Sequence, residues 1–291
     1  MKLQQKEVNM ITGTLPTKRP FSKKVFIFLL ILIFPAVYAA LPYSLTITST
    51  TLKLSEWFIV LAASLIDVAI YGVLAAIGLY FAAKIGLGLP FVESWLEREP
   101  TEKPQVPVTP VEEPPHGTVR GMLVFSVIAG IIIALVVLAL SYYIFSPLLQ
   151  AELESLGIAV PDAPQPPPWQ GVLVSFSAGV NEEVMFRLFG VTLLAWVGSL
   201  VFHDREGRPT LAVLWIASIL IAVLFGLAHL PMTIALGLPL TPLVIVRAVV
   251  LNGIGGVLLG WLYWTRGLES AMVAHFSADI VLHVILVLIL Q

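Results

Sequence analysis

The chain has 291 residues, of which 58% are hydrophobic and only 12% are charged, and its formal net charge is -2. Soluble domains carry about 25% charged residues, so this composition predicts a protein whose surplus apolar surface faces lipid. The small net charge gives no indication of a nucleic acid partner. The chain has no cysteine, which excludes a disulfide framework, thiolate metal ligands and a cysteine nucleophile.

Hydropathy predicts an all-α fold, a polytopic bundle of seven transmembrane helices. A bilayer span needs roughly 20 mostly apolar residues. Seven stretches meet this condition: 25–42, 57–83, 121–147, 171–202, 211–230, 243–264 and 268–290. The fourth stretch is long for a single span, and a break at Gly190 or Gly198 would give eight spans.

The chain has four parts, two polar regions and two regions of apolar helices. Residues 1–24 form a basic N-terminus, 25–96 hold the first two helices, 97–118 form a linker rich in Pro and Glu, and 119–291 hold the other helices. The linker composition predicts an extended or disordered segment. Lys and Arg concentrate on the side of the N-terminus, so we expect that end to be cytoplasmic. The first span also ends in a sequence that fits a signal-peptidase site, which leaves its cleavage open.

Three ionisable residues lie close together in the fourth span, where each charge costs about 2.5–3.5 kcal/mol near the bilayer centre. Glu183 and Arg187 are four residues apart, so they can pair on one face of a helix. Such a pair has a purely structural explanation, because it can orient helices. Glu182 points about 100° away and has no local partner. A carboxylate with a fixed position and an adjustable pKa is what a general base requires.

Two histidines on later spans complete a polar set. His229 follows Phe225 by four residues, and His275 is followed by Asp279 at the same spacing. Polar residues on separate transmembrane helices tend to converge on the bundle interior. At 1.5 Å per residue, His229 would lie about 28 Å and His275 about 10 Å from the inner ends of their spans. Convergence therefore requires tilted helices, a break, or shifted boundaries.

Three motifs now resemble a known family. They are E-E-x-x-x-R at 182–187, F-x-x-x-H at 225–229 and H-x-x-x-D at 275–279, within a core of about 171–283. The chain resembles the CAAX prenyl protease and bacteriocin-processing family, also called the ABI family, which includes the type II CAAX prenyl endopeptidases. The resemblance implies an all-α bundle with a polar intramembrane cavity that opens toward the cytoplasm. It also implies a membrane peptidase that hydrolyses a peptide bond of a membrane-anchored or prenylated peptide or protein. Its partners would be that substrate and the lipid bilayer.

The resemblance also implies roles for the motif residues. Glu182, helped by His229, would activate a water molecule, and His275 with residue 279 would stabilise the oxyanion. Residues that support the site or bind substrate would be Glu183, Arg187 and Phe225.

Asp279 departs from the family pattern, because better-known members carry Asn there. An Asn amide can donate a hydrogen bond to an oxyanion, whereas an ionised Asp cannot. This leaves three possibilities for Asp279. It is protonated, or it orients a neighbouring histidine, or it binds a divalent metal such as zinc together with Glu182, His229 and His275. A glutamate-activated water that requires no cofactor is the leading interpretation, and a metalloendopeptidase stays open.

Two other functions fit the composition. The chain could be a non-catalytic scaffold or immunity protein of the same fold, although a scaffold has no evident need for the unpaired Glu182. It could also be a transporter that relays protons or cations, although paired half-helix repeats are not seen in the sequence. The glycines of 253–260 favour close helix packing over a functional loop. The sequence does not identify the substrate.

Overall fold

The computed structural model describes residues 20–96, 118–159 and 164–290. Within these ranges the fold is helical and has no strand, which confirms the predicted all-α class. Most of the predicted basic N-terminus and of the Pro/Glu-rich linker, residues 1–19 and 97–117, lies outside the described residues.

The helices follow the hydropathy pattern of the sequence, with π-helical segments (η) inside three of them. In chain order they are α2 (Lys23–Ala39), α3 (Leu41–Ile47), α4 (Leu54–Ile85), α5 (Pro90–Leu96), α6 (Val119–Leu140), η1 (Ser141–Phe145), α7 (Ser146–Ser155), α8 (Pro168–Glu182), η2 (Glu183–Val191), α9 (Thr192–Ser199), α10 (Leu211–Ala228), α11 (Leu230–Ala235), α12 (Pro242–Arg266), α13 (Leu268–Ile280), η3 (Val281–Ile285) and α14 (Leu286–Leu290).

Six helical stretches of the described residues are long and apolar enough to cross a membrane. They are Lys23–Ile47, Leu54–Ile85, Val119–Ser155, Leu211–Ala235, Pro242–Arg266 and Leu268–Leu290. These correspond to six of the seven predicted spans and support a multi-pass membrane protein. The remaining predicted span, α8 to α9, is helical throughout but is not among the six. A count of seven or eight spans and a cytoplasmic N-terminus stay predictions.

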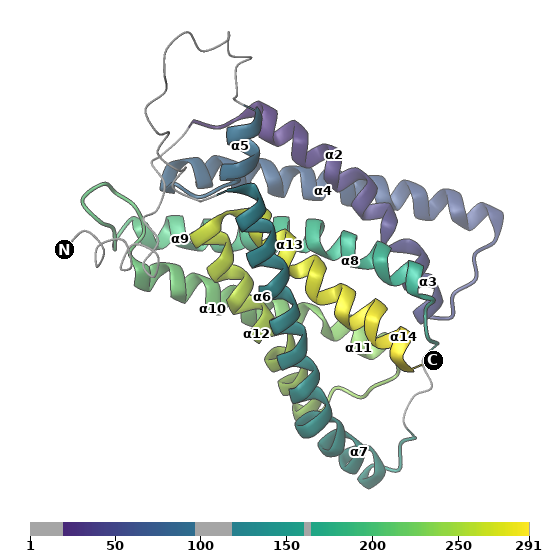
Figure 1. The fold of residues 1–291 in the computed structure, drawn as a ribbon. Helices are drawn as coiled ribbons and strands as arrows, with labels where there is room; N and C mark the ends of the chain where they lie inside the picture. Colours follow the sequence, from purple (N-terminus) through teal and green to yellow (C-terminus); the bar gives the residue numbers. More distant parts are fainter. Residues whose placement is uncertain (1–19, 97–117, 160–163, 291) are drawn as a thin grey trace.

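The segment from α8 to α9 lies at the centre of the bundle. Figure 1 shows α2 and α4 on one side of it and α10 and α13 on the other. The chain does not break at Gly190 or Gly198, and it widens instead into the π-helical segment η2. The charged residues of the fourth predicted span are therefore carried by a helix that neighbouring helices surround.

Glycines allow the helices around this segment to approach closely. A methyl group on Gly78 of α4 would lie 2.6 Å from the carbonyl oxygen of Leu188 in η2. One on Gly256 of α12 would lie 2.9 Å from the Cβ atom of Ala222 in α10. The predicted packing role of the glycines in 253–260 is confirmed at Gly256. These contacts fix η2 between α4 and the α10–α12 pair.

Candidate active site

Glu183 and Arg187 form an ion pair inside the bundle. Their Oε1 and Nη1 atoms lie 2.9 Å apart, and the side chains are 0% and 1% exposed. Arg187 also donates from Nη2 to the carbonyl oxygen of Gly256 on α12, at 3.3 Å. Its guanidinium group lies over the ring of Phe225 on α10, at 4.6 Å from the ring centre. The predicted ion pair is thus formed, and Arg187 ties η2 to two further helices.

His275 of α13 joins this pair from the other side. Its Nδ1 atom lies 2.7 Å from Oε1 of Glu183. A carboxylate can only accept, so Nδ1 carries the proton and donates it in this hydrogen bond. The other ring nitrogen, Nε2, lies 3.8 Å from Oε2 of Glu182 and 3.7 Å from Oδ2 of Asp279. These two distances exceed hydrogen-bond length, so His275 presents a free nitrogen beside two carboxylates.

Glu182 differs from its neighbour in exposure. It ends α8 at the point where the π-helical segment η2 begins, and its side chain is 29% exposed. Segments of π-helix are rare in proteins and occur frequently at functional sites. Glu182 also interacts electrostatically with Arg187, His229, His275 and Asp279. Of the two adjacent glutamates, Glu182 is therefore the accessible one, and it interacts with four other predicted site residues.

His229 is held in one orientation by its own helix. It follows the last residue of α10, and its Nδ1 atom lies 2.8 Å from the carbonyl oxygen of Phe225. Because a carbonyl oxygen only accepts, Nδ1 carries a proton, and in the neutral imidazole Nε2 is then the nitrogen with the lone pair. The Phe225 ring lies 4.7 Å from the His229 ring and 5.9 Å from the His275 ring, between ring centres. Phe225 thus packs against both histidines.

The helices are inclined to one another, and this resolves the difference in depth expected from the sequence (Figure 1). Phe225 is the fifteenth residue of α10 and His275 the eighth of α13, yet their rings are neighbours. The structure therefore brings the three motifs together from η2, α10 and α13. Each predicted site residue lies in this cluster or in electrostatic contact with it.

The metal interpretation needs a ligand set, and the arrangement does not supply one. Among the described residues, no group of three or more His, Asp or Glu side chains is placed to hold a metal ion. Zinc ligands lie about 2.0–2.2 Å from the ion when they are His or carboxylate. In this arrangement Nδ1 of His275 is bonded to Glu183, and Nε2 lies 3.8 Å from Oε2 of Glu182 and 3.7 Å from Oδ2 of Asp279. We therefore derive no step through a metal, and metal dependence stays a prediction.

Two tyrosines near the site belong to none of the three motifs. Tyr71 of α4 interacts electrostatically with Glu182. Tyr43 of α3 interacts electrostatically with Asp279 and bonds through its hydroxyl group to Nδ1 of His283, at 3.2 Å. Both come from the N-terminal helices, far in sequence from the three motifs. No spacing in the sequence links them to the site, so only the fold could identify them.

The fold and this cluster define an all-helical membrane protein with a buried glutamate, arginine and histidine site. Residues 164–281 match the family described as type II CAAX prenyl endopeptidase Rce1-like. The part of the chain that carries the site is therefore similar to this family, which supports the resemblance of the three motifs. No curated protein and no solved structure matched the chain. Helices α2 to α7 lie outside the matched range.

Proposed function

We propose that this protein is an intramembrane endopeptidase of the type II CAAX prenyl protease kind. It would cleave a peptide bond near the C-terminus of a prenylated or otherwise membrane-anchored peptide. One observation carries the proposal: an ion-paired Glu183 holds His275 so that its free nitrogen lies beside the accessible Glu182. The family match over 164–281 supports the same activity.

Glu182 acts as the general base in this proposal. Its carboxylate takes a proton from a water molecule, and the water oxygen attacks the carbonyl carbon of the scissile bond. The lone pair on Nε2 of His229 accepts the second hydrogen of the same water, because Nδ1 is bonded to Phe225. General bases of this kind contribute typically 10²–10⁴-fold to a rate.

His275 stabilises the charge that the attack produces. As the new bond forms, the carbonyl electron pair moves to oxygen and creates an oxyanion. When both ring nitrogens of His275 are protonated, Nε2–H can donate to that oxyanion, while Nδ1–H stays bonded to Glu183. Glu182 then passes its proton to the amide nitrogen, the carbon–nitrogen bond breaks, and the intermediate collapses to a carboxylic acid and an amine.

Asp279 has a different role from that of an oxyanion donor. Its carboxylate lies 3.7 Å from Nε2 of His275, where a negative charge favours the protonated imidazole. Of the three interpretations of Asp279, we therefore favour the orientation and charging of His275. Arg187 and Phe225 act as positioning residues, because they hold Glu183 and the two histidines.

The test is cleavage of a farnesylated CAAX peptide by the purified full-length protein, with the released tripeptide measured by mass spectrometry. We expect Glu182→Gln to lower the rate by about 10²–10⁴-fold while the protein keeps its thermal stability. Glu154→Gln is the matched control, because Glu154 is exposed on α7 and its side chain accepts a hydrogen bond from the nearby Gln150. Full activity of Glu182→Gln would overturn the assignment of the base.

A strong chelator separates the two mechanisms. Activity that survives the chelator supports a glutamate-activated water without metal. Activity that the chelator removes and a divalent metal restores would replace this mechanism by a metal-dependent one. If the wild type cleaves neither a farnesylated nor an unmodified membrane-anchored peptide, the endopeptidase proposal fails.

A further inference from the structure

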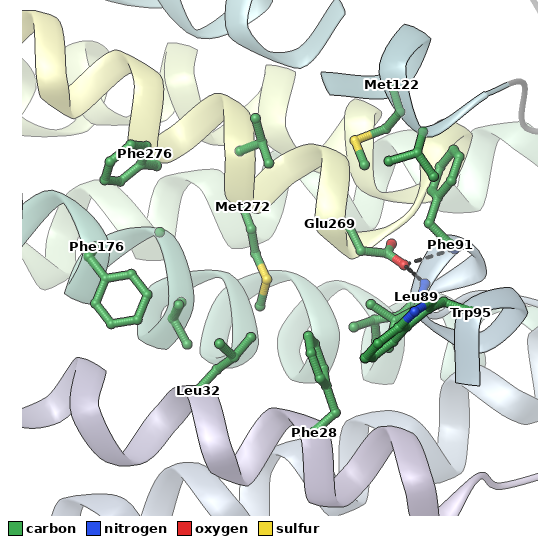
Figure 2. A pocket seen from close by; sticks show the side chains of 15 residues that line it. Phe28, Leu32, Leu89, Phe91, Trp95, Met122, Phe176, Glu269, Met272 and Phe276 are labelled. Carbon is green, nitrogen blue, oxygen red and sulfur yellow. Dashed lines mark hydrogen bonds between the residues drawn. The ribbon is translucent and has the colours of Figure 1, made fainter. Parts of the chain in front are cut away.

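A second feature of the bundle is an apolar cavity away from the candidate active site. It has a volume of about 490 Å³ and lies between α2, α5, α6, α8 and α13. Binding sites for small molecules have volumes of about 300–1,000 Å³. Figure 2 shows its walls, which are almost entirely aromatic and aliphatic side chains. Among the described residues that line it, Glu269 alone has an ionisable side chain.

Glu269 has one satisfied and one unsatisfied carboxyl oxygen. It lies in the first turn of α13 and is 8% exposed. Oε1 accepts from the backbone N–H groups of Phe91 and Val92 on α5, at 2.9 and 2.8 Å. Oε2 is buried and has no hydrogen-bond partner among the described residues. In Figure 2 the dashed lines reach one carboxyl oxygen only, and the other turns away from α5.

The cavity has a polar end and an apolar end. Glu269 lies at the end formed by α5 and the first turn of α13, and Phe176 and Phe276 lie at the opposite end in Figure 2. Trp95 and Val119, which also line it, are 61% and 51% exposed, so the cavity opens on the apolar surface of the helices. An elongated molecule with one polar end can enter there from the bilayer.

The cavity is distinct from the candidate active site. It is lined on α13 by Glu269, Met272, Val273 and Phe276, and none of the four predicted catalytic residues lines it. With 3.6 residues per turn, Phe276 points about 100° away from His275. The two sites therefore use different sides of the same helix.

We propose that this cavity binds a single-chain amphiphile from the bilayer, a long-chain amine or alcohol. Its head group donates a hydrogen bond to Oε2 of Glu269, and its alkyl chain packs against Phe176 and Phe276. An amine or hydroxyl group supplies the donor that the buried oxygen lacks. A head group with acceptors alone leaves that oxygen unpaired, and a plain hydrocarbon does so as well. This inference is independent of the proposed peptidase activity.

The test uses a dodecylamine probe with a photoreactive diazirine at the end of its chain, added to the purified full-length protein in lipid nanodiscs. The matched probe replaces the amine by a methyl ether, which accepts but cannot donate. We expect the amine to label peptides containing Phe176 and Phe276 at least fivefold more than the ether does, as mapped by mass spectrometry. Equal labelling by both probes, or labelling elsewhere, would overturn the proposal.

Glu269→Gln sharpens the test without removing the bonds to α5. The amide oxygen of Gln can still accept from Phe91 and Val92, which puts the NH₂ group, a donor, in the place of Oε2. The ratio of amine to ether labelling should then fall to one or below. A ratio unchanged from the wild type would contradict the role of Glu269.

Two further arms separate this site from the peptidase. Glu182→Gln should leave the labelling ratio unchanged even if it abolishes cleavage, and a changed ratio would refute the independence of the two sites. A farnesylated CAAX peptide should not displace the amine. Competitive displacement would show that the chain in the cavity belongs to the substrate, and the bilayer source would be wrong.

Discussion

Two arginine–carboxylate pairs of this protein have the same spacing in very different surroundings. Glu183 and Arg187 lie in η2, and Asp204 and Arg208 lie in the loop between α9 and α10. In both pairs the partners are four residues apart and the closest nitrogen and oxygen atoms are 2.9 Å apart. The side chains of Glu183 and Arg187 are 0% and 1% exposed, whereas those of Asp204 and Arg208 are 38% and 19% exposed.

The comparison shows that burial, rather than spacing or distance, decides how much such a pair matters. In an exposed ion pair each side chain replaces contacts with water by a contact with its partner, so the pair adds little to the free energy of unfolding. A buried pair has lost its water, so removing one partner leaves the other charge uncompensated. The pair in η2 also supports the candidate site, because Glu183 holds His275.

Arg187→Ala should have the largest effect on stability. It leaves Glu183 buried without its charge partner and removes the contacts with Gly256 and Phe225. Breaking one side of a buried ion pair destabilises a protein by about 3–5 kcal/mol. Thermal unfolding of the purified protein in detergent would measure the loss, and cleavage should fall with it.

The double variant Glu183→Gln with Arg187→Met is the control for this prediction. It removes both charges and keeps similar side-chain volume, so it should be more stable than Arg187→Ala. Its activity should stay low, because His275 loses the carboxylate that holds it. Normal yield and stability of Arg187→Ala would show that Glu183 and Arg187 do not form a buried ion pair.

Glu269 provides an intermediate case, since its buried carboxyl group is bonded to backbone rather than to a cation. Glu269→Ala removes an acceptor from the N–H groups of Phe91 and Val92. A buried donor that loses its partner costs about 1–3 kcal/mol. Glu269→Gln keeps the acceptor and should unfold close to the wild type. If both variants were equally destabilised, the bonds to α5 would not be the cause.

Asp279→Asn tests a weaker contact of the site. The carboxylate lies 3.7 Å from Nε2 of His275, beyond hydrogen-bond length. Removing its charge should lower kcat/KM by less than about tenfold, which corresponds to 1.4 kcal/mol. Asp279→Ala should lose more, because it also opens space beside the imidazole. A loss as large as that of Glu182→Gln would favour a metal ligand at this position.

The sequence predicts the parts of this molecule that depend on local spacing. The all-α class, six of the seven predicted spans and the Glu183–Arg187 pair follow from hydropathy and from a separation of four residues. Glu269 was not foreseen, because its partners on α5 lie 177 and 178 residues away in the chain. The same holds for Tyr71, which reaches Glu182 only through the packing of α4 on η2.

The π-helical segment could not be predicted either. The length of the fourth span suggested a break at a glycine, but the extra residues are absorbed by widening the helix from Glu183 to Val191. Hydropathy records which residues face lipid and does not distinguish an α-helix from a π-helix. The position of Glu182 at this junction is therefore a property of the tertiary packing.

The smallest effect is expected at the exposed pair, and it should depend on pH. Slight burial raises the pKa of Asp204, but hydrogen bonds from the backbone N–H of Arg208, from its side chain and from the backbone N–H of Glu206 outweigh it and lower the pKa. A carboxylate with a lowered pKa in the folded state stabilises the fold above the pKa of the unfolded chain. This contribution is lost as the pH falls through the lower, folded value.

Arg208→Ala should therefore reduce stability by no more than about 1 kcal/mol at neutral pH. The difference from the wild type should shrink as the pH falls below about 4, where an aspartate of the unfolded chain becomes protonated. Thermal unfolding of both proteins at pH 7 and at the lowest pH that keeps them folded would measure this. An effect of Arg208→Ala as large as that of Arg187→Ala would show that spacing, and not burial, governs the two pairs.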